Sequence, residues 1–305
     1  MKFGKLNDLT DIDFTFPEDP IENQKLFDNI SQKNAKSQIF IGTTGWYNKE
    51  WQGTYYPKKT STSSFLVEYS KQLDSIELNT THYRIPTIEN IESWKQKVSN
   101  DFKFCPKITQ SISHRGPLKD KINLLKTFYT PIQELGKNLG ICFMQLPESY
   151  GSDKKGDLKH FLNHAPSHIP LAVEFRDKSW FSNRNEFLEL YQILESYKIT
   201  PVISDVAGRR DVLHLRLSTD KLIVRFVGNS LHSTDYFRLD QWIQRLSDWF
   251  NLGLKEVYFF FHQPDMNDVP PIVNYFVDQV NKTTSLPKLK KMSSKSSENS
   301  QLELF

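Results

Sequence analysis

The chain has 305 residues, of which 38% are hydrophobic and 13% aromatic, so it can bury a large core in one or two domains. Its 39 basic and 36 acidic residues leave a net charge of +3, a balance that does not indicate nucleic-acid binding and allows only for a local basic patch. The two cysteines, Cys105 and Cys142, exclude a disulfide framework, and the apolar runs around them predict buried free thiols in a reducing compartment.

The N-terminal segment, residues 1–37, is polar and carries Phe14, Phe16 and Phe27 as isolated aromatic residues. It contains no apolar signal segment, and no run in the chain approaches the ~18 apolar residues of a membrane span. We therefore expect an N-terminal extension that covers the body of a cytoplasmic protein, with no membrane partner.

Eight short apolar runs follow the extension and alternate with amphipathic stretches. Short, nearly continuous apolar runs are typical of strands that are buried on both faces. The eight runs are IFIGTT, SIELNT, FKFCPKI, GICFMQL, LAVEFR, TPVISD, LIVRFVG and VYFFFH.

The stretches between the runs predict helices. We expect helices that begin at Thr87, Asp240 and Asp268, with the second ending near Gly253 and a kink at Pro131 in an earlier one. The link that follows TPVISD is only partly helical in pattern.

Strand and helix alternation repeated eight times predicts an α/β fold, a (β/α)₈ TIM barrel over residues 38–284. The alternative is an open doubly wound sheet, but no G-x-G-x-x-G or Walker loop follows any strand. Residues 285–305 are rich in Lys and Ser, which predicts a flexible tail.

Polar residues end most of the predicted strands, and in a TIM barrel these ends form the active-site mouth. The candidate catalytic residues are Glu77, Asn79, Lys107, Gln145, Glu174, Arg176 and Asp205, and the candidate substrate-binding residues are Trp46, Tyr83, Arg225 and His262.

The chemistry of this set is open at the level of sequence. Glu174 beside Arg176 could act as an oriented acid or base, and Arg176 with Lys107 and Arg225 could clamp a phosphate or carboxylate. The opposing interpretation is that these residues form ion pairs that fill the barrel interior.

No cofactor is assigned from the sequence. A divalent metal held by Glu77, Glu174, Asp205 and His262 is a further alternative, although no ligand spacing supports it. The aromatic loop TTGWYNKEWQGTYYP could stack a base or sugar ring, or it could simply anchor itself over the barrel.

Five blocks of the sequence, in order, carry a family resemblance: GTTGWYNKEWQGTYYP, IELNTTHYRIP, FKFCPKITQSISH, LGICFMQLPES and LAVEFRDKSWF. They resemble domain-of-unknown-function family 72, also called YecE-like, whose members are similar to TIM barrels. The resemblance implies the fold and leaves the reaction open. The positions that it singles out are Gly45, Trp46, Glu77, Asn79, Lys107, Gln145, Glu174, Arg176 and Arg225. The chain departs from the family pattern at His82, Val227 and His262, where members typically have Phe, His and Asn.

The final pentapeptide, QLELF, resembles the bacterial sliding-clamp-binding motif. Its matching positions are Gln301, Leu302, Leu304 and Phe305, and a short apolar peptide on a polar tether is a common recognition mode. We therefore consider the DNA polymerase sliding clamp a candidate partner and nucleic acid a candidate substrate.

Three functions remain open on sequence alone. The first is a hydrolase or nuclease-like enzyme that acts on a phosphate-bearing or nucleic-acid substrate and is recruited by the clamp. The second is an enzyme that acts on a sugar or a small acid, and the third is a non-catalytic module that binds an anion or nucleotide.

Overall fold

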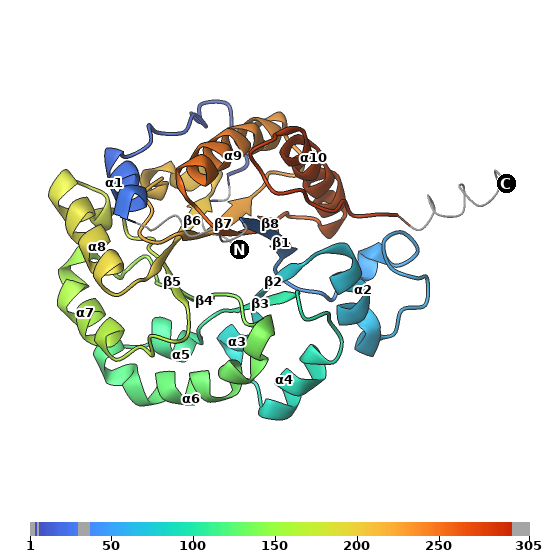
Figure 1. The fold of residues 1–305 in the computed structure, drawn as a ribbon, viewed down its shortest axis with the longest axis horizontal. Coiled ribbons are helices and arrows are strands. Elements are labelled where there is room, and N and C mark those ends of the chain that lie inside the picture. The colour runs from blue at the N-terminus through green and yellow to red at the C-terminus, as the bar shows by residue number, and fades with distance from the viewer. Residues whose placement is uncertain (1–3, 5, 30–36, 295–305) are drawn as a thin grey trace.

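The computed structural model describes residue 4, residues 6–29 and residues 37–294. Eight parallel strands run in the order β3-β2-β1-β8-β7-β6-β5-β4, and the helices surround them (Figure 1). The strands are β1 (Gln38–Thr43), β2 (Ser75–Leu78), β3 (Lys103–Pro106), β4 (Cys142–Gln145), β5 (Leu171–Glu174), β6 (Thr200–Asp205), β7 (Lys221–Val227) and β8 (Glu256–His262). The eight predicted apolar runs and the TIM-barrel-like fold are confirmed.

The ring closes between β3 and β4 through sparse contacts. The Gly140 N–H donates to the Phe104 carbonyl at 2.8 Å, and the Ile108 N–H donates to the Phe143 carbonyl at 2.8 Å. These bonds join the two edge strands of an otherwise continuous sheet, so the barrel is nearly closed.

Alternation along the strands decides which side chains enter the barrel. Residues two apart share a face, so each strand contributes every second side chain to the interior. The lower interior is a separate apolar cluster of buried residues: Phe40, Cys105, Ile141, Phe143, Ala172, Val202, Ile223, Tyr258 and Phe260. On three of these strands the residue two positions further along is charged. These residues are Lys107, Glu174 and Arg225, and they form a charged layer above the apolar cluster.

The outer helices are α2 (Phe65–Gln72), α3 (Thr80–Tyr83), α4 (Ile88–Lys95), α5 (Gln110–Ser113), α6 (Ile122–Ile132), α7 (Lys155–Asn163), α8 (Arg184–Ser196), α9 (Ser233–Leu252) and α10 (Val269–Lys282).

Most of the predicted helix signals are confirmed. Thr87 and Asn90 form a reciprocal cap at the start of α4, and Gly253 ends α9 with a φ of 128°. Pro131 lies one residue before the end of α6, where the helix passes into a 3₁₀ segment. The start predicted at Asp240 is wrong, because α9 already begins after His232, whose side chain accepts a hydrogen bond from a backbone N–H of the first turn.

The N-terminal extension forms part of the outer ring. Its helix α1 (Ile21–Asn29) lies between α8 and α9 in Figure 1. The side-chain amide of Asn23 donates to the Leu215 carbonyl at 2.7 Å and accepts from the Leu217 N–H at 2.8 Å. Because only a 3₁₀ segment connects β6 to β7, α1 occupies the position that a helix would otherwise take there.

The chain beyond α10 also packs, contrary to the expectation of a flexible tail from residue 285. Leu286 and Met292 are buried, and the Met292 backbone exchanges two hydrogen bonds with the Asn274 side chain. The Ser293 backbone does the same with Gln72 on α2. Apolar residues spaced among lysines thus hold residues 286–294 on the barrel.

Among the described residues, no helix is both long and apolar enough to cross a membrane.

Candidate functional site

The charged layer of the barrel is organised around Arg225 of β7, which is 1% exposed. Its guanidinium donates two hydrogen bonds to Glu77 of β2, both at 2.9 Å, and one to Glu174 of β5 at 2.7 Å. Glu174 also accepts from Arg176 Nε at 2.6 Å. One arginine thus connects two strands on opposite sides of the ring, with a bidentate geometry that favours the pairing.

This pairing keeps both carboxylates ionised. Burial alone would raise the pKa of Glu77, but the charge of Arg225 holds it well below its usual range. For Glu174 the charges of Arg176 and Arg225 overcome the effect of burial and lower the pKa to about 2. Neither carboxyl group carries a proton at neutral pH, so neither can serve as a general acid there.

His262 of β8 lies beside the same carboxylate. Its Nε2 is 2.9 Å from Glu77 Oε2, and burial lowers the pKa of the imidazole below its ordinary value. Because ionised Glu77 can only accept, the neutral ring carries its proton on Nε2 and presents a lone pair on Nδ1. Asn79 donates to Glu77 Oε1 at 2.9 Å and completes the pairing of this carboxylate.

Lys107, which follows β3, is 5% exposed. Within the part of the chain that the structure describes, its ammonium group makes no hydrogen bond or ion pair, and its Nζ lies 6.0 Å from the centre of the Phe143 ring. Burial and the nearby charge of Arg225 lower the pKa of Lys107 to about 8, while Glu77 and Glu174 oppose the shift.

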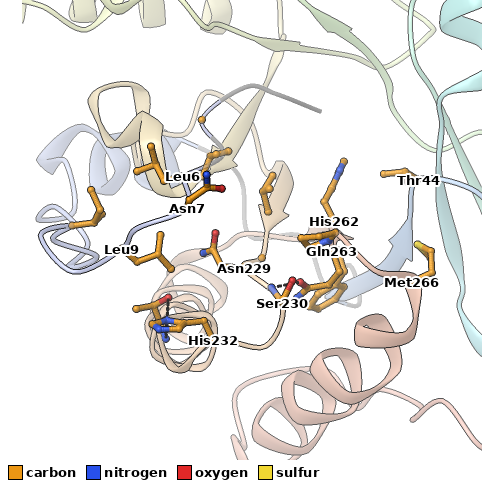
Figure 2. Close-up of a pocket in the computed structure, with 18 of the residues that line it drawn as sticks. Leu6, Asn7, Leu9, Thr44, Asn229, Ser230, His232, His262, Gln263 and Met266 are labelled. Carbon is orange, nitrogen blue, oxygen red and sulfur yellow. Dashed lines mark hydrogen bonds between the residues drawn. The ribbon is translucent and has the colours of Figure 1, made fainter.

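A cavity of about 1200 Å³ opens above this layer, and its lining includes Lys107, Asn79 and His262. Figure 2 shows this cavity with His262 among the labelled residues. The N-terminal segment and the loops after β7 and β8 supply most of its remaining lining. In Figure 2, Leu6, Asn7 and Leu9 lie on one side, and Thr44 and Met266 lie on the other.

Asp205 does not join the site. Its carboxylate accepts hydrogen bonds from Arg238 Nη1 at 3.1 Å and from Trp242 Nε1 at 2.9 Å, both on α9, and it pairs with Arg210. Since Val202 of β6 points into the barrel, Ser204 shares its face and Asp205 points to the helices. The proposed cluster of four metal ligands is therefore not assembled, and no group of three or more His, Cys, Asp or Glu side chains in the described residues could hold a metal ion.

The other candidates are divided between the mouth and the scaffold. Tyr83 lines the cavity and is 73% exposed, and Gln145 is buried on β4 next to Glu174 in register. Trp46 packs against Trp94 of α4 with ring centres 5.7 Å apart, so it anchors its loop. Gln301, Leu302, Leu304 and Phe305 lie outside the described residues.

Two walls of the cavity were not predicted from the sequence. One is the segment from Leu6 to Ile12. The sequence predicted that the N-terminal extension covers the body of the protein, but not that this segment lines a cavity. The other is the loop after β7, where Ser230 and Leu231 adopt left-handed φ angles of 56° and 61°. Non-glycine residues rarely adopt this conformation, and no glycine in the sequence marks those two positions.

A parallel eight-stranded barrel with a charged interior layer under a cavity at its carboxyl end defines a TIM-barrel-like protein. Residues 40–297 match the family described as "Protein of unknown function DUF72", and the chain belongs to this family. The resemblance inferred from the five sequence blocks is thereby confirmed.

Individual relatives agree with this assignment. The UPF0759 protein YecE of Escherichia coli (strain K12) is 27% identical over 263 residues, which cover 80% of this chain and 93% of YecE. The UPF0759 protein YunF of Bacillus subtilis (strain 168) is 30% identical over 152 residues, 47% of this chain and 52% of YunF. A crystal structure of a DUF72 family protein from Enterococcus faecalis V583 superimposes with a TM-score of 0.63 at 19% identity, covering 83% of this chain and 100% of that one, and it supports the fold.

Proposed function

We propose that the protein is an enzyme that carries out acid–base chemistry on a small anionic, oxygen-rich molecule such as a sugar acid or sugar phosphate. The observation that carries this proposal is the hydrogen bond between His262 and ionised Glu77 at the base of the cavity. It fixes the imidazole tautomer and leaves one ring nitrogen available as a base.

The lowered pKa of His262 suits this role. A neutral imidazole is the competent form of a general base, and burial keeps His262 neutral at the pH of a cell. When it accepts a proton, the adjacent carboxylate of Glu77 stabilises the imidazolium at a distance of 2.9 Å. The pair can therefore take up a proton and return it without a change of geometry.

The charge of the buried layer at the base of the cavity favours an anion. Lys107, Arg176 and Arg225 are cationic, whereas Glu77 and Glu174 are anionic, so these five side chains carry one net positive charge. Inside a poorly solvated barrel this excess attracts a carboxylate or phosphate more strongly than it would in water.

The cavity favours a small substrate over a polymer. Its volume of about 1200 Å³ slightly exceeds the usual size of a small-molecule site, and the segment from Leu6 to Ile12 forms one of its walls. A sugar phosphate fits in such a space, whereas a single nucleic-acid strand is typically bound in a positively charged groove that follows its backbone.

Ligand-induced changes in melting temperature test the substrate class. We expect sugar phosphates and sugar acids to raise the melting temperature and a single-stranded DNA oligonucleotide to leave it unchanged. Ligands that bind are then incubated with the protein in deuterated water, and proton NMR follows their conversion or hydrogen exchange. His262→Asn should keep the binding and lose the turnover; turnover at the wild-type rate in this variant would contradict the proposal.

A second candidate, the clamp-recruited phosphodiester hydrolase, is supported by the sequence QLELF. Ser294 adjoins the Ser293–Gln72 hydrogen bonds on the outer wall, and residues 295–300 separate it from Gln301. The test is capture of the sliding clamp by the full chain and by Phe305→Ala; equal capture would remove the reason to connect this barrel with DNA.

A further inference from the structure

We infer that Lys107 is a nucleophilic amine that forms a covalent imine with a carbonyl group of the substrate. This inference rests on the proposed function, since it assigns an aldehyde or ketone to the same small anionic molecule. It starts from the position of Lys107, which is a buried cation that lines the cavity and lacks a bonding partner among the described residues.

Comparison with other buried cations shows what is unusual about Lys107. Arg225 is held by Glu77 and Glu174, and Arg238 is held by Asp205 and Asp235. Burying an ammonium group without a hydrogen-bonded partner is costly, so a chain that only needed structure would pair it or replace it. The amine is therefore available to a ligand.

The backbone around Lys107 holds its side chain at the cavity. The Thr81 hydroxyl donates to the Lys107 carbonyl at 2.7 Å, and the Lys107 N–H donates to the Leu78 carbonyl at 3.3 Å. These bonds tie the residue to β2 and to the helix that follows it. Since Cys105 points into the barrel interior, Lys107 does so as well, one layer higher.

The electrostatic surroundings suit an imine as well as they suit an ammonium group. A protonated imine carries the same single positive charge as the ammonium group of Lys107. The ionised carboxylates of Glu77 and Glu174, which favour the charged form of Lys107, favour the iminium in the same way. Covalent attachment therefore leaves the net charge of the layer unchanged.

The reaction balances with groups that line the cavity. The ammonium group of Lys107 first gives a proton to His262 Nδ1, and the nitrogen lone pair of the amine forms a bond to the carbonyl carbon. The attached nitrogen then passes one of its two remaining protons to the carbonyl oxygen, which gives the neutral carbinolamine. The C–O bond then breaks as His262 returns its proton to the departing hydroxyl, which leaves as water, and a protonated imine remains.

The protonation equilibrium supports this chemistry. An amine reacts only when it is unprotonated, and a change of the pKa from 10.5 to about 8 raises its unprotonated fraction near neutral pH by roughly two orders of magnitude. A buried lysine next to a second cation, here Arg225, is a recognised arrangement for an activated amine.

Reductive trapping tests the inference. The full chain is incubated near neutral pH with pyruvate, with dihydroxyacetone phosphate, or with acetone as a neutral control, and then reduced with sodium borohydride. Peptide mass mapping of wild-type protein should find the reduced adduct of one of the two anionic carbonyl compounds on Lys107, about a hundredfold above exposed lysines such as Lys58 and Lys59. Lys107→Arg and Lys107→Met should show no adduct at this position and only the background on exposed lysines.

The outcomes separate this inference from the proposed function. Adducts spread evenly over exposed lysines, or no adduct at all, would overturn the covalent step, while ligand-induced melting shifts would still support the acid–base site. A Lys107 adduct in wild-type protein supports the inference even if the Lys107 variants fail to fold, because the mapping is made on the unaltered chain. Trapping at Lys107 without any effect of His262→Asn on turnover would instead overturn the assignment of the base.

Discussion

The two halves of the barrel interior are built from the same strands but are held together by different forces. In the lower half, apolar side chains such as Ile223 and Phe260 fill the space. One pleat higher, β7 and β8 present Arg225 and His262 instead. The lower half is stabilised by burial and packing alone, whereas the upper half depends on the charges that its members supply to one another.

The difference separates structural from functional parts of the interior. Truncation of an apolar side chain in the lower half leaves a cavity. Removal of one charged side chain in the upper half leaves the buried groups that it contacted without a partner. Arg225 and Arg176 together balance the charges of Glu77 and Glu174 and so make a polar layer possible. Lys107 and His262, at the upper edge of this layer, keep atoms available to a ligand.

The largest expected effect is that of removing Arg225. Arg225→Met leaves Glu77 and Glu174 buried without their shared cation and should lower the free energy of unfolding by about 3–5 kcal/mol at neutral pH. Phe260→Ala in the lower half is the matched control and should cost a similar amount through its cavity. Urea unfolding of both variants measures the two losses.

The pH dependence of these two losses distinguishes the two halves. The pKa of Glu174 falls from 4.5 to about 2 in the folded protein, so its contribution to stability is present above pH 4.5 and is lost as the pH falls toward 2. The penalty of Arg225→Met should shrink over this range because the carboxyl groups become neutral, whereas that of Phe260→Ala should stay constant. If the loss of unfolding free energy changed with pH in the same way for both variants, the proposed difference between the two halves would be contradicted.

A smaller effect is expected for Asp205, which points away from the barrel interior. Asp205→Asn removes a charge partner from Arg210 and Arg238, but Asp235 still pairs with Arg238, so we expect a loss of about 2 kcal/mol. Chemical denaturation measures this loss. Ligand-induced melting shifts should be the same as in the wild type, and a loss of ligand binding would place Asp205 in the site after all.

His262→Asn should cost about 1 kcal/mol, since one hydrogen bond to Glu77 is lost while Arg225 and Asn79 still pair with this carboxylate. In the wild type, nitrogen-15 NMR of the histidine rings should show His262 protonated on Nε2 and neutral at pH 6.5. Titration of His262 above this pH would show that its pKa is not lowered.

The smallest effect on stability is expected at Tyr83, which is 73% exposed at the rim of the cavity. Tyr83→Ala should change the free energy of unfolding by less than about 0.5 kcal/mol. If the ring contacts the ligand, binding measured by calorimetry should weaken by about 1 kcal/mol. Unchanged binding would remove Tyr83 from the substrate-binding residues.

Much of the fold could be read from the sequence because burial on both faces leaves a strong signal. Strands such as GICFMQL and VYFFFH are almost continuously apolar, and this pattern located all eight. The packing of residues 286–294 could not be read in the same way, since Leu286 and Met292 are isolated among lysines and depend on partners such as Asn274 and Gln72. Long-range pairings of this kind leave no periodicity in the chain.

The candidate site was predictable in part for the same reason. Polar strand ends indicated Glu77, Glu174 and Arg225, and these three do meet. The orientation of Asp205 was not predictable, because every residue of β6 is buried and only the structure shows that Val202 points into the barrel. Which cation would remain unpaired was not predictable, since the geometry of the whole ring decides whether Arg225 or Lys107 reaches the carboxylates.

The position of α1 has a consequence for how the chain reaches its native state on the ribosome. This helix is synthesised near the beginning, yet the Leu215 carbonyl that accepts a hydrogen bond from Asn23 lies 192 residues further along. Until that region and α9 emerge, nascent α1 lacks these partners, and the outer layer of helices stays incomplete beside β6 and β7. Completion of the outer layer of helices is therefore a late event that joins one of the first parts of the polypeptide to be synthesised to one of the last.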